Sequence, residues 1–254
     1  MTSIIPSTSV PALDRVMLVL NYLSNNPGKS FSQIQGDLQL PGSSTSSLLN
    51  SLLAHNLIRK ERNLFFLGTT LTTLGHASLE QRDICHIAKP IMAELRDKTQ
   101  LTCHLGVMQN TVAVYLLKME SNQAVSINTW VGKNLSLHSS GIGKALCAWL
   151  PVEELFRLFP DEQLKRFTSN TIITRTELFE ELEAVKERGF AYDNEEDAPE
   201  VNCIACPIFD NQNNVQAAIS MSGVGNQFLK EKREEFSYLI LNSAHKIQKQ
   251  IWGE

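Results

Sequence analysis

Apolar residues recur every three or four positions in three segments before residue 55, and this spacing predicts three short helices. The first helix ends at residues 25–28, where proline and glycine follow two asparagines. The second begins at a capping box formed by Ser30 and Gln33, and the third follows a turn at residues 40–42. The pattern is carried by Leu13, Val16, Leu20, Leu23, Ile34, Leu38, Leu48, Leu49, Leu52 and Leu53.

Two short apolar runs follow the third helix, at residues 57–60 and 64–67, and the charged turn between them predicts a hairpin. A helix, a tight turn, a second helix and a hairpin, in this order, predict a winged helix-turn-helix over residues 31–68. A helix that projects from such a turn fits the major groove of DNA, and the hairpin beside it can contact phosphates. This part of the chain is therefore predicted to bind DNA.

The polar side of the third helix carries small hydroxyl and amide side chains, which let a helix lie close to base edges. An ordinary solvated helix has the same composition. The hairpin favours DNA binding, because its Arg59, Lys60 and Arg62 concentrate positive charge where phosphate contacts are expected. The residues predicted to contact DNA are Ser43, Ser44, Thr45, Ser46, Ser47, Asn50, Ser51, Arg59, Lys60 and Arg62.

The pattern changes to strand-like alternation after a predicted helix over residues 84–98. Thr174 with Glu177 caps a later helix that ends at Gly189, and an amphipathic helix occupies residues 229–252. Helices that bracket an antiparallel sheet make an α+β fold. The predicted strands are residues 102–107, 112–117, 125–131, 203–209 and 215–222.

Composition narrows the class of protein. No apolar run reaches the roughly 18 to 20 residues that cross a bilayer, and residues 1–15 lack a secretory signal. The five cysteines are odd in number and lie among apolar residues, which suits reduced thiols better than disulfides. We expect a cytoplasmic protein with no membrane partner.

Charge is distributed unevenly. Residues 1–68 carry five Lys or Arg and three Asp or Glu, which is a net charge of +2. The whole chain has a net charge of −4, so the net charge of the remaining residues is −6. The sign of this asymmetry suits a DNA-binding head on an acidic body.

The head resembles the IclR family of bacterial transcriptional regulators. Residues 43–52 are similar to the recognition helix of that family, and residues 66–68 with 74–75 are similar to the end of its wing and the start of its linker helix. The chain has Ser47 where the family usually has arginine, and the family usually has a basic residue near Gly42. Both departures bear on the operator sequence.

The resemblance continues over nearly the whole chain. Residues 137–145, 193–196 with 203–207, and 218–223 are similar to motifs of the GAF-like effector domain of the family, with Glu200 and Asn202 as departures near the pocket. The resemblance implies a winged helix-turn-helix at 8–68, a linker helix at 69–83 and an effector-binding domain at 84–254. It also implies a homodimer, or a tetramer on DNA.

The same motifs predict an effector site for an anion. Ser140 and Gly141 precede a predicted helix, whose free N–H groups and dipole attract a carboxylate. Ser220 and Ser222 share one face of a strand, since they are two residues apart. Alternatively, these residues only start a helix and fill a sheet. By resemblance, an apolar wall completes the site. The predicted effector residues are Ala124, Ile127, Trp130, Ser140, Gly141, Ile142, Asp193, Cys203, Ser220 and Ser222.

Enzyme and metal chemistry find less support. Residues 141–144 lack the spacing of a phosphate-binding loop, and residues 203–206, although C-x-x-C, lie on a predicted strand that sends the two thiols to opposite faces. Adjacent Cys-His pairs are poor metal ligands. His138 is expected to be structural, residues 195–197 a solvated turn, and Glu181 and Glu183 a helix surface. No cofactor and no metal are predicted.

The sequence thus predicts a DNA-binding regulator, and the resemblance implies that it acts on a catabolic operon, as a repressor, and senses a small organic acid or sugar acid. The sequence itself does not distinguish repression from activation. The alternative is an enzyme that processes small molecules on the GAF-like domain with Cys203 as its nucleophile. That alternative needs a positioned base, which no local motif identifies.

Overall fold

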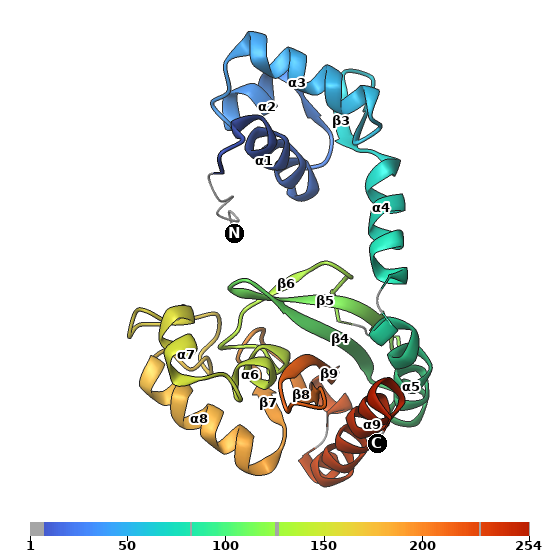
Figure 1. Ribbon diagram of the computed structural model, residues 1–254, viewed down its shortest axis with the longest axis vertical. Coiled ribbons are helices and arrows are strands. Elements are labelled where there is room, and N and C mark those ends of the chain that lie inside the picture. The colour runs from blue at the N-terminus through green and yellow to red at the C-terminus, as the bar shows by residue number, and fades with distance from the viewer. Residues whose placement is uncertain (1–7, 82, 125–126, 229, 254) are drawn as a thin grey trace. The chain divides into compact units, whose positions relative to one another are not determined.

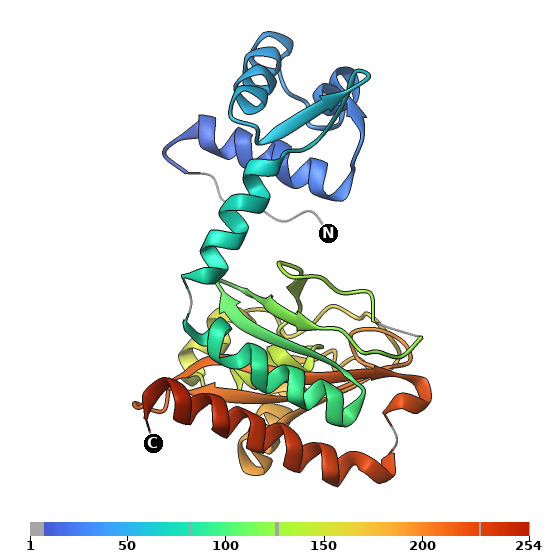
Figure 2. The ribbon, with the colours of Figure 1, turned by 90° about the vertical axis from the view of Figure 1, so that its right-hand side faces the viewer.

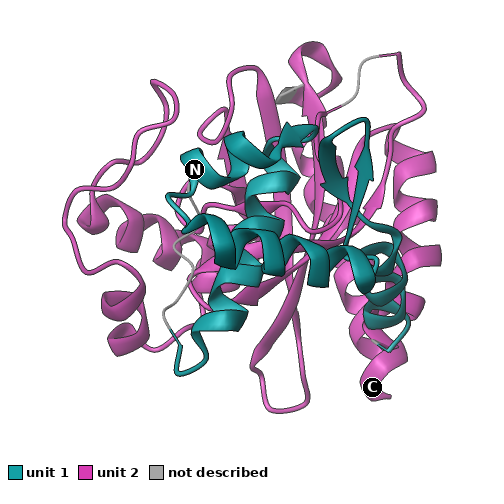
Figure 3. Ribbon diagram, turned by 90° about the horizontal axis from the view of Figure 1, so that it is seen from above, with its two compact units in different colours: residues 1–81 teal, residues 82–254 magenta. Residues whose placement is uncertain are grey.

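The computed structural model describes residues 8–81, 83–124, 127–228 and 230–253. The chain forms two compact units, residues 1–81 and 82–254 (Figure 3). Segment 69–83, predicted to be a linker, falls largely in unit 1 as a helix, and its role as a linker stays a prediction.

Unit 1 has the predicted order of a winged helix-turn-helix (Figure 1). Its strands form one antiparallel sheet in the order β1-β3-β2, and the apolar sides of its first three helices pack on this sheet. Its elements are α1 (Pro11–Asn25), β1 (Lys29–Ser30), α2 (Phe31–Asp37), α3 (Gly42–Ala54), β2 (Ile58–Glu61), β3 (Leu64–Leu67) and α4 (Thr69–Glu80).

The core of unit 1 follows the leucine pattern with one exception. Leu20, Leu49 and Leu52 are buried, whereas Leu13 is 52% exposed because it lies in the first turn of α1, ahead of the buried positions of that helix. The predicted capping box is present, since the Ser30 hydroxyl accepts from the Gln33 N–H and the Gln33 side chain accepts from the Ser30 N–H.

Unit 2 is built on a six-stranded antiparallel sheet in the order β6-β5-β4-β9-β8-β7. The predicted strand at 125–131 is wrong in its described part, because residues 127–131 lie outside any strand and the next one begins at Asn134. Residues 125–126 lie outside the described residues. The strands are β4 (Thr102–Gln109), β5 (Val112–Met119), β6 (Asn134–Leu135), β7 (Ala191–Asn194), β8 (Val201–Phe209) and β9 (Val215–Val224).

Helices cover both faces of this sheet. Helices α5 (Asp83–Thr99) and α9 (Arg233–Trp252) lie side by side across one face (Figure 2), and α6 (Gly141–Cys147) packs on the other. Helix α9 begins later than predicted, because 3₁₀ turns at Gly225–Gln227 and Lys230–Lys232 precede it. The remaining helices are α7 (Val152–Leu158) and α8 (Arg175–Arg188).

Local chemistry explains where these helices begin and end. The Thr174 hydroxyl accepts from the Glu177 N–H at the start of α8, and Gly189 ends that helix in the left-handed conformation, both as predicted. Within the described ranges, none of the helices combines the length and the hydropathy that a bilayer crossing requires.

Candidate DNA-binding and effector-binding sites

The predicted recognition helix, α3, presents a polar face. Its exposed side chains recur three and four residues apart, so they share one side of the helix, while Leu49 and Leu52 anchor the other in the core. The Ser47 hydroxyl donates to the Ser43 carbonyl at 3.3 Å, which leaves its oxygen free to accept. The exposed members of the predicted set are Ser43, Ser46, Ser47, Asn50 and Ser51.

Two members of the predicted set lie differently. Thr45 is 1% exposed, and its hydroxyl donates to the Pro41 carbonyl at 2.8 Å, so this residue belongs to the core and the prediction that it contacts DNA is wrong. Ser44 is half-buried and bonds to the same carbonyl at 2.9 Å. Both hydroxyls thus bond within the first turn of α3, where the N-cap residue Pro41 makes no side-chain hydrogen bond.

The wing carries its three cations on exposed side chains. Arg62 has a φ of 50° in the turn between β2 and β3, which places it at the end of the hairpin. Arg59 lies 4.6 Å from the centroid of the Phe66 ring and pairs with Glu61. The edge strand β2 and the adjoining turn therefore carry all three cations, but Arg59 and Lys60 lie over the successive rings Phe66 and Phe65, on opposite faces of the hairpin, and Glu61 offsets part of their charge.

Unit 2 holds a cavity of about 240 Å³, which we call the effector cavity. Seven of the ten predicted effector residues line it: Ile127, Ser140, Gly141, Ile142, Asp193, Cys203 and Ser222. Sequence reasoning did not assign the other lining residues, which are Tyr115, Asn128, Thr129, Lys133, Leu135, Asp197, Ala198, Val201 and Val224.

Three predicted residues lie outside the lining. Trp130 is 56% exposed with Lys133 against its ring, and Ala124 is exposed, so neither forms the expected apolar wall. Both were predicted by resemblance to the family. Ser220 is fully buried and lies on the same sheet face as Ser222, opposite Ala205 rather than opposite Cys203.

The start of α6 is shaped by Ser140. Its hydroxyl accepts from the Gly143 N–H at 3.0 Å and donates to the Ser136 carbonyl at 2.6 Å. The helix can approach the sheet closely because residue 141 is glycine: a Cβ there would lie 3.2 Å from the Cys203 sulfur. Close packing thus brings Ser140, Gly141 and Ile142 to the wall of the cavity.

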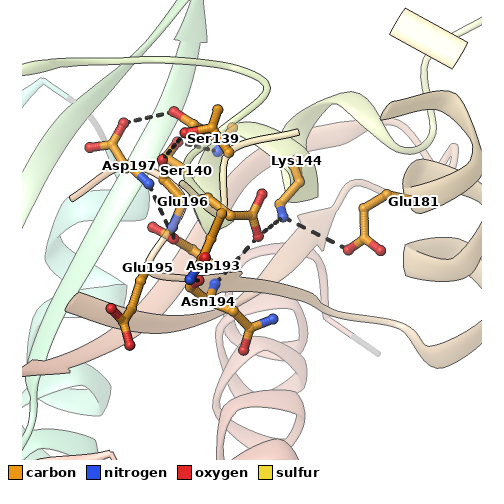
Figure 4. Close-up of polar contacts among 12 residues, drawn as sticks. Ser139, Ser140, Lys144, Glu181, Asp193, Asn194, Glu195, Glu196 and Asp197 are labelled. Atoms are coloured by element: carbon orange, nitrogen blue, oxygen red, sulfur yellow. Dashed lines mark hydrogen bonds and ion pairs between the residues drawn. The ribbon is translucent and has the colours of Figure 1, made fainter. Parts of the chain in front are cut away.

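A cluster of acidic side chains lies between α6 and the segment that follows β7 (Figure 4), and two of them, Asp193 and Asp197, line the cavity. Burial raises the pKa of the Asp193 carboxyl to about 7, although its Oδ1 accepts from the Glu196 N–H at 2.7 Å. Asp197, which also lines the cavity, accepts from the Ser139 hydroxyl at 2.8 Å. A protonated Asp193 can both accept and donate hydrogen bonds, and the raised pKa brings this form within reach near neutral pH.

Lys144 is 1% exposed, and its Nζ lies 2.6 Å from Glu196 and 3.8 Å from Glu181 (Figure 4). The predicted solvated turn at 195–197 is therefore wrong for Glu196, which is buried to balance this charge. Glu181 is also more than a helix surface, since it pairs with Lys144 as well as with Arg188. The ion pair joins α6 to the segment between β7 and β8.

Cys203 does not have the electrostatics of a nucleophile. Burial raises the pKa of its thiol to about 12, so the thiolate that an enzyme would need is disfavoured at neutral pH. His138 bonds to the Ser136 hydroxyl and the Lys165 carbonyl, both at 2.9 Å, in the structural role expected for it. Among the described residues, no group of three His, Cys, Asp or Glu side chains is placed to hold a metal.

Comparison with known proteins identifies the family of this chain. The sequence profile of the IclR helix-turn-helix domain matches residues 12–62, and that of the bacterial transcriptional regulator IclR C-terminal domain matches residues 76–249. The HTH-type transcriptional regulator RhmR of Escherichia coli K12 is 35% identical over 244 residues, which cover 96% of this chain and 94% of RhmR. The HTH-type transcriptional repressor AllR of Salmonella typhimurium is 33% identical, covering 93% and 88%.

A solved structure agrees over the same extent. The IclR of Thermotoga maritima superposes with a TM-score of 0.77 at 30% sequence identity, covering 95% of this chain and 98% of that protein. The predicted α+β fold with an N-terminal winged helix-turn-helix is confirmed by this match. The chain belongs to the IclR family of bacterial transcriptional regulators.

Proposed function

We propose that this regulator represses transcription of a catabolic operon by binding two operator half-sites as a homodimer or a dimer of dimers, and that a small organic acid or sugar acid changes this binding. Repression is supported by the relative AllR, which is named a transcriptional repressor at 33% identity. The few cations of each head support pairing, because one head alone would neutralise few phosphates.

The observation that carries the proposal is the effector cavity. Its volume of about 240 Å³ lies below the roughly 300 to 1,000 Å³ of pockets for drug-sized ligands, so a small metabolite fits better than a nucleotide. Its lining includes the cation Lys133 together with the carboxyl groups of Asp193 and Asp197. This set suits an acid that also carries hydroxyl groups, with its carboxylate toward Lys133 and its hydroxyls toward the aspartates.

The coupling has a simple thermodynamic form. An effector shifts the heads between two arrangements only if it binds one of them more tightly, and DNA then changes effector affinity by the same factor.

Fluorescence anisotropy with DNA from the protein's own promoter tests the proposal. We expect tight binding and an affinity that changes when pyruvate, lactate or gluconate is added. The acid that acts should also raise the melting temperature of the DNA-free protein, because it binds the folded state. Absence of binding to promoter DNA, or a DNA affinity indifferent to an acid that raises the melting temperature, would overturn it.

A further inference from the structure

One wall of the effector cavity has neither helix nor strand. Residues 127–133, all described, contribute Ile127, Thr129 and Lys133 to the lining. The end of this segment is fixed to β5 by backbone hydrogen bonds, because the Gly132 N–H donates to the Tyr115 carbonyl at 2.8 Å and the Tyr115 N–H to the Lys133 carbonyl at 3.2 Å. The beginning of the segment needs another attachment.

Two side chains of the sheet provide it. His104 Nε2 lies 2.8 Å from the Thr129 hydroxyl, and Lys118 Nζ donates to the Ile127 carbonyl at 3.2 Å and to the Thr129 carbonyl at 3.0 Å. Residues 104 and 118 are direct partners across β4 and β5, so the two contacts arise from one point of the sheet. Together they reach the backbone and the side chain of Thr129.

His104 contacts a residue that lines the cavity as well as the buried residues of the sheet. It is fully buried and stacks on Tyr115, which lines the cavity, with the ring centroids 4.2 Å apart and the planes at 18°. It pairs with Ser220 across β4 and β9, on the sheet face that also carries Ser222. Burial lowers the pKa of the imidazole to about 3, so His104 is neutral and its contact with Thr129 persists at physiological pH.

One buried polar atom at this point, His104 Nδ1, has no hydrogen-bond partner among the described residues. An unpaired polar atom costs free energy when it is buried, so His104 is not explained as a filler of the sheet. Its contact with Thr129 is the interaction that the structure offers as a reason for a histidine here.

We propose that His104 and Lys118 are positioning residues of the effector cavity, which hold residues 127–129 against Tyr115 and so limit access to Cys203 on the cavity wall. The identification of the cavity as an effector site rests on the proposed function, whereas the positioning itself needs neither effector nor DNA.

Two variants remove the histidine contact from opposite ends. His104→Phe keeps a ring to stack on Tyr115 but cannot bond to Thr129, and Thr129→Val removes the hydroxyl with little change in shape. For each variant of the full chain, hydrogen exchange of residues 127–133 and the labelling rate of each cysteine by N-ethylmaleimide are followed by peptide mass spectrometry. Cys147, which is buried in α6 and does not line the cavity, is the internal control.

We expect both variants to raise exchange in the segment and labelling of Cys203 by about tenfold, as for the loss of one buried hydrogen bond. Cys147 labelling should stay unchanged, and the double variant should add little to either single one, since both remove the same interaction. Lys118→Met should act in the same direction. Unchanged exchange in both single variants overturns the proposal, and so does a parallel rise at Cys147, which would mean general loosening. Neither result would alter DNA binding or an acid-induced rise in melting temperature, so the proposed function is tested separately.

Discussion

Asp193 is a buried carboxyl in the lining of the effector cavity. Burial raises its pKa from 3.8 to about 7, so the folded chain holds this proton more tightly than the unfolded chain does. The tighter proton binding adds at most about 4 kcal/mol to the free energy of unfolding below pH 4. This contribution decreases as the pH rises from 4 to 7. We therefore expect Asp193→Asn, whose side-chain oxygen can still accept from the Glu196 N–H, to gain stability relative to the wild type between pH 4 and 8.

Urea unfolding followed by tryptophan fluorescence measures this difference, because all three tryptophans lie in unit 2. Both proteins contain the neighbouring charged residues Lys144, Glu196 and Asp197, so the difference between the two proteins reports the change at residue 193. Asp210→Asn is the control, since a backbone hydrogen bond from Asn214 lowers the pKa of Asp210, so the pH dependence of that residue lies below pH 4 and its difference from the wild type should stay constant between pH 4 and 8. An Asp193→Asn difference that stays constant with pH would contradict the assignment.

At this scale, local patterns predicted that Ser140 comes directly before a helix and that Ser220 and Ser222 share one face of a strand, and the structure has both. The pair Lys144 and Glu196 escaped prediction because its partners lie 52 residues apart, and no periodicity links them. Thr45 was assigned to the wrong side because serine and threonine alike are read as polar, whereas its hydroxyl is satisfied within the first helical turn.

At the scale of elements, alternation predicted β4, β5, β8 and β9, which are long and lie inside the sheet. Residues 127–131, the described part of the predicted strand 125–131, form no strand; side-chain contacts from β4 and β5 hold this segment without strand pairing. The two-residue strands β1 and β6 are too short to show a period. Pairing with neighbours, rather than local pattern, defines them.

The position of α6 depends on Gly143. A Cβ at this residue would lie 2.4 Å from the Ser136 carbonyl oxygen and 2.6 Å from the Leu137 Cα, so it would push against backbone that cannot turn aside. We expect Gly143→Ala to displace α6 and to destabilise unit 2 by about 1–3 kcal/mol or more. The loss should appear as a lower urea midpoint in tryptophan fluorescence.

Gly75→Ala is the matched control, because Gly75 lies inside α4 with nothing within 4 Å of an added Cβ. It should leave the tryptophan transition unchanged and stabilise α4 by about 0.5–1 kcal/mol, as alanine does in a helix interior. Wild-type stability in Gly143→Ala would show that α6 can shift without cost, and the close packing of α6 on β8 would then not define the cavity.

For the whole molecule, the question is how a chain of net charge −4 binds a polyanion. The wing concentrates Arg59, Lys60 and Arg62, so their joint replacement by alanine should weaken binding to every DNA sequence. The slope of log K against log salt should also become shallower, by about 0.9 for each phosphate that the variant no longer neutralises. Anisotropy titrations between about 50 and 200 mM salt, where such phosphate interactions change affinity strongly, measure that slope.

Replacing three exposed lysines of unit 2 by alanine changes the net charge equally and should leave the slope unchanged; these are Lys89, Lys232 and Lys249. Equal slopes for the wing variant and the wild type would remove the wing from the DNA interface and leave α3 to bind alone.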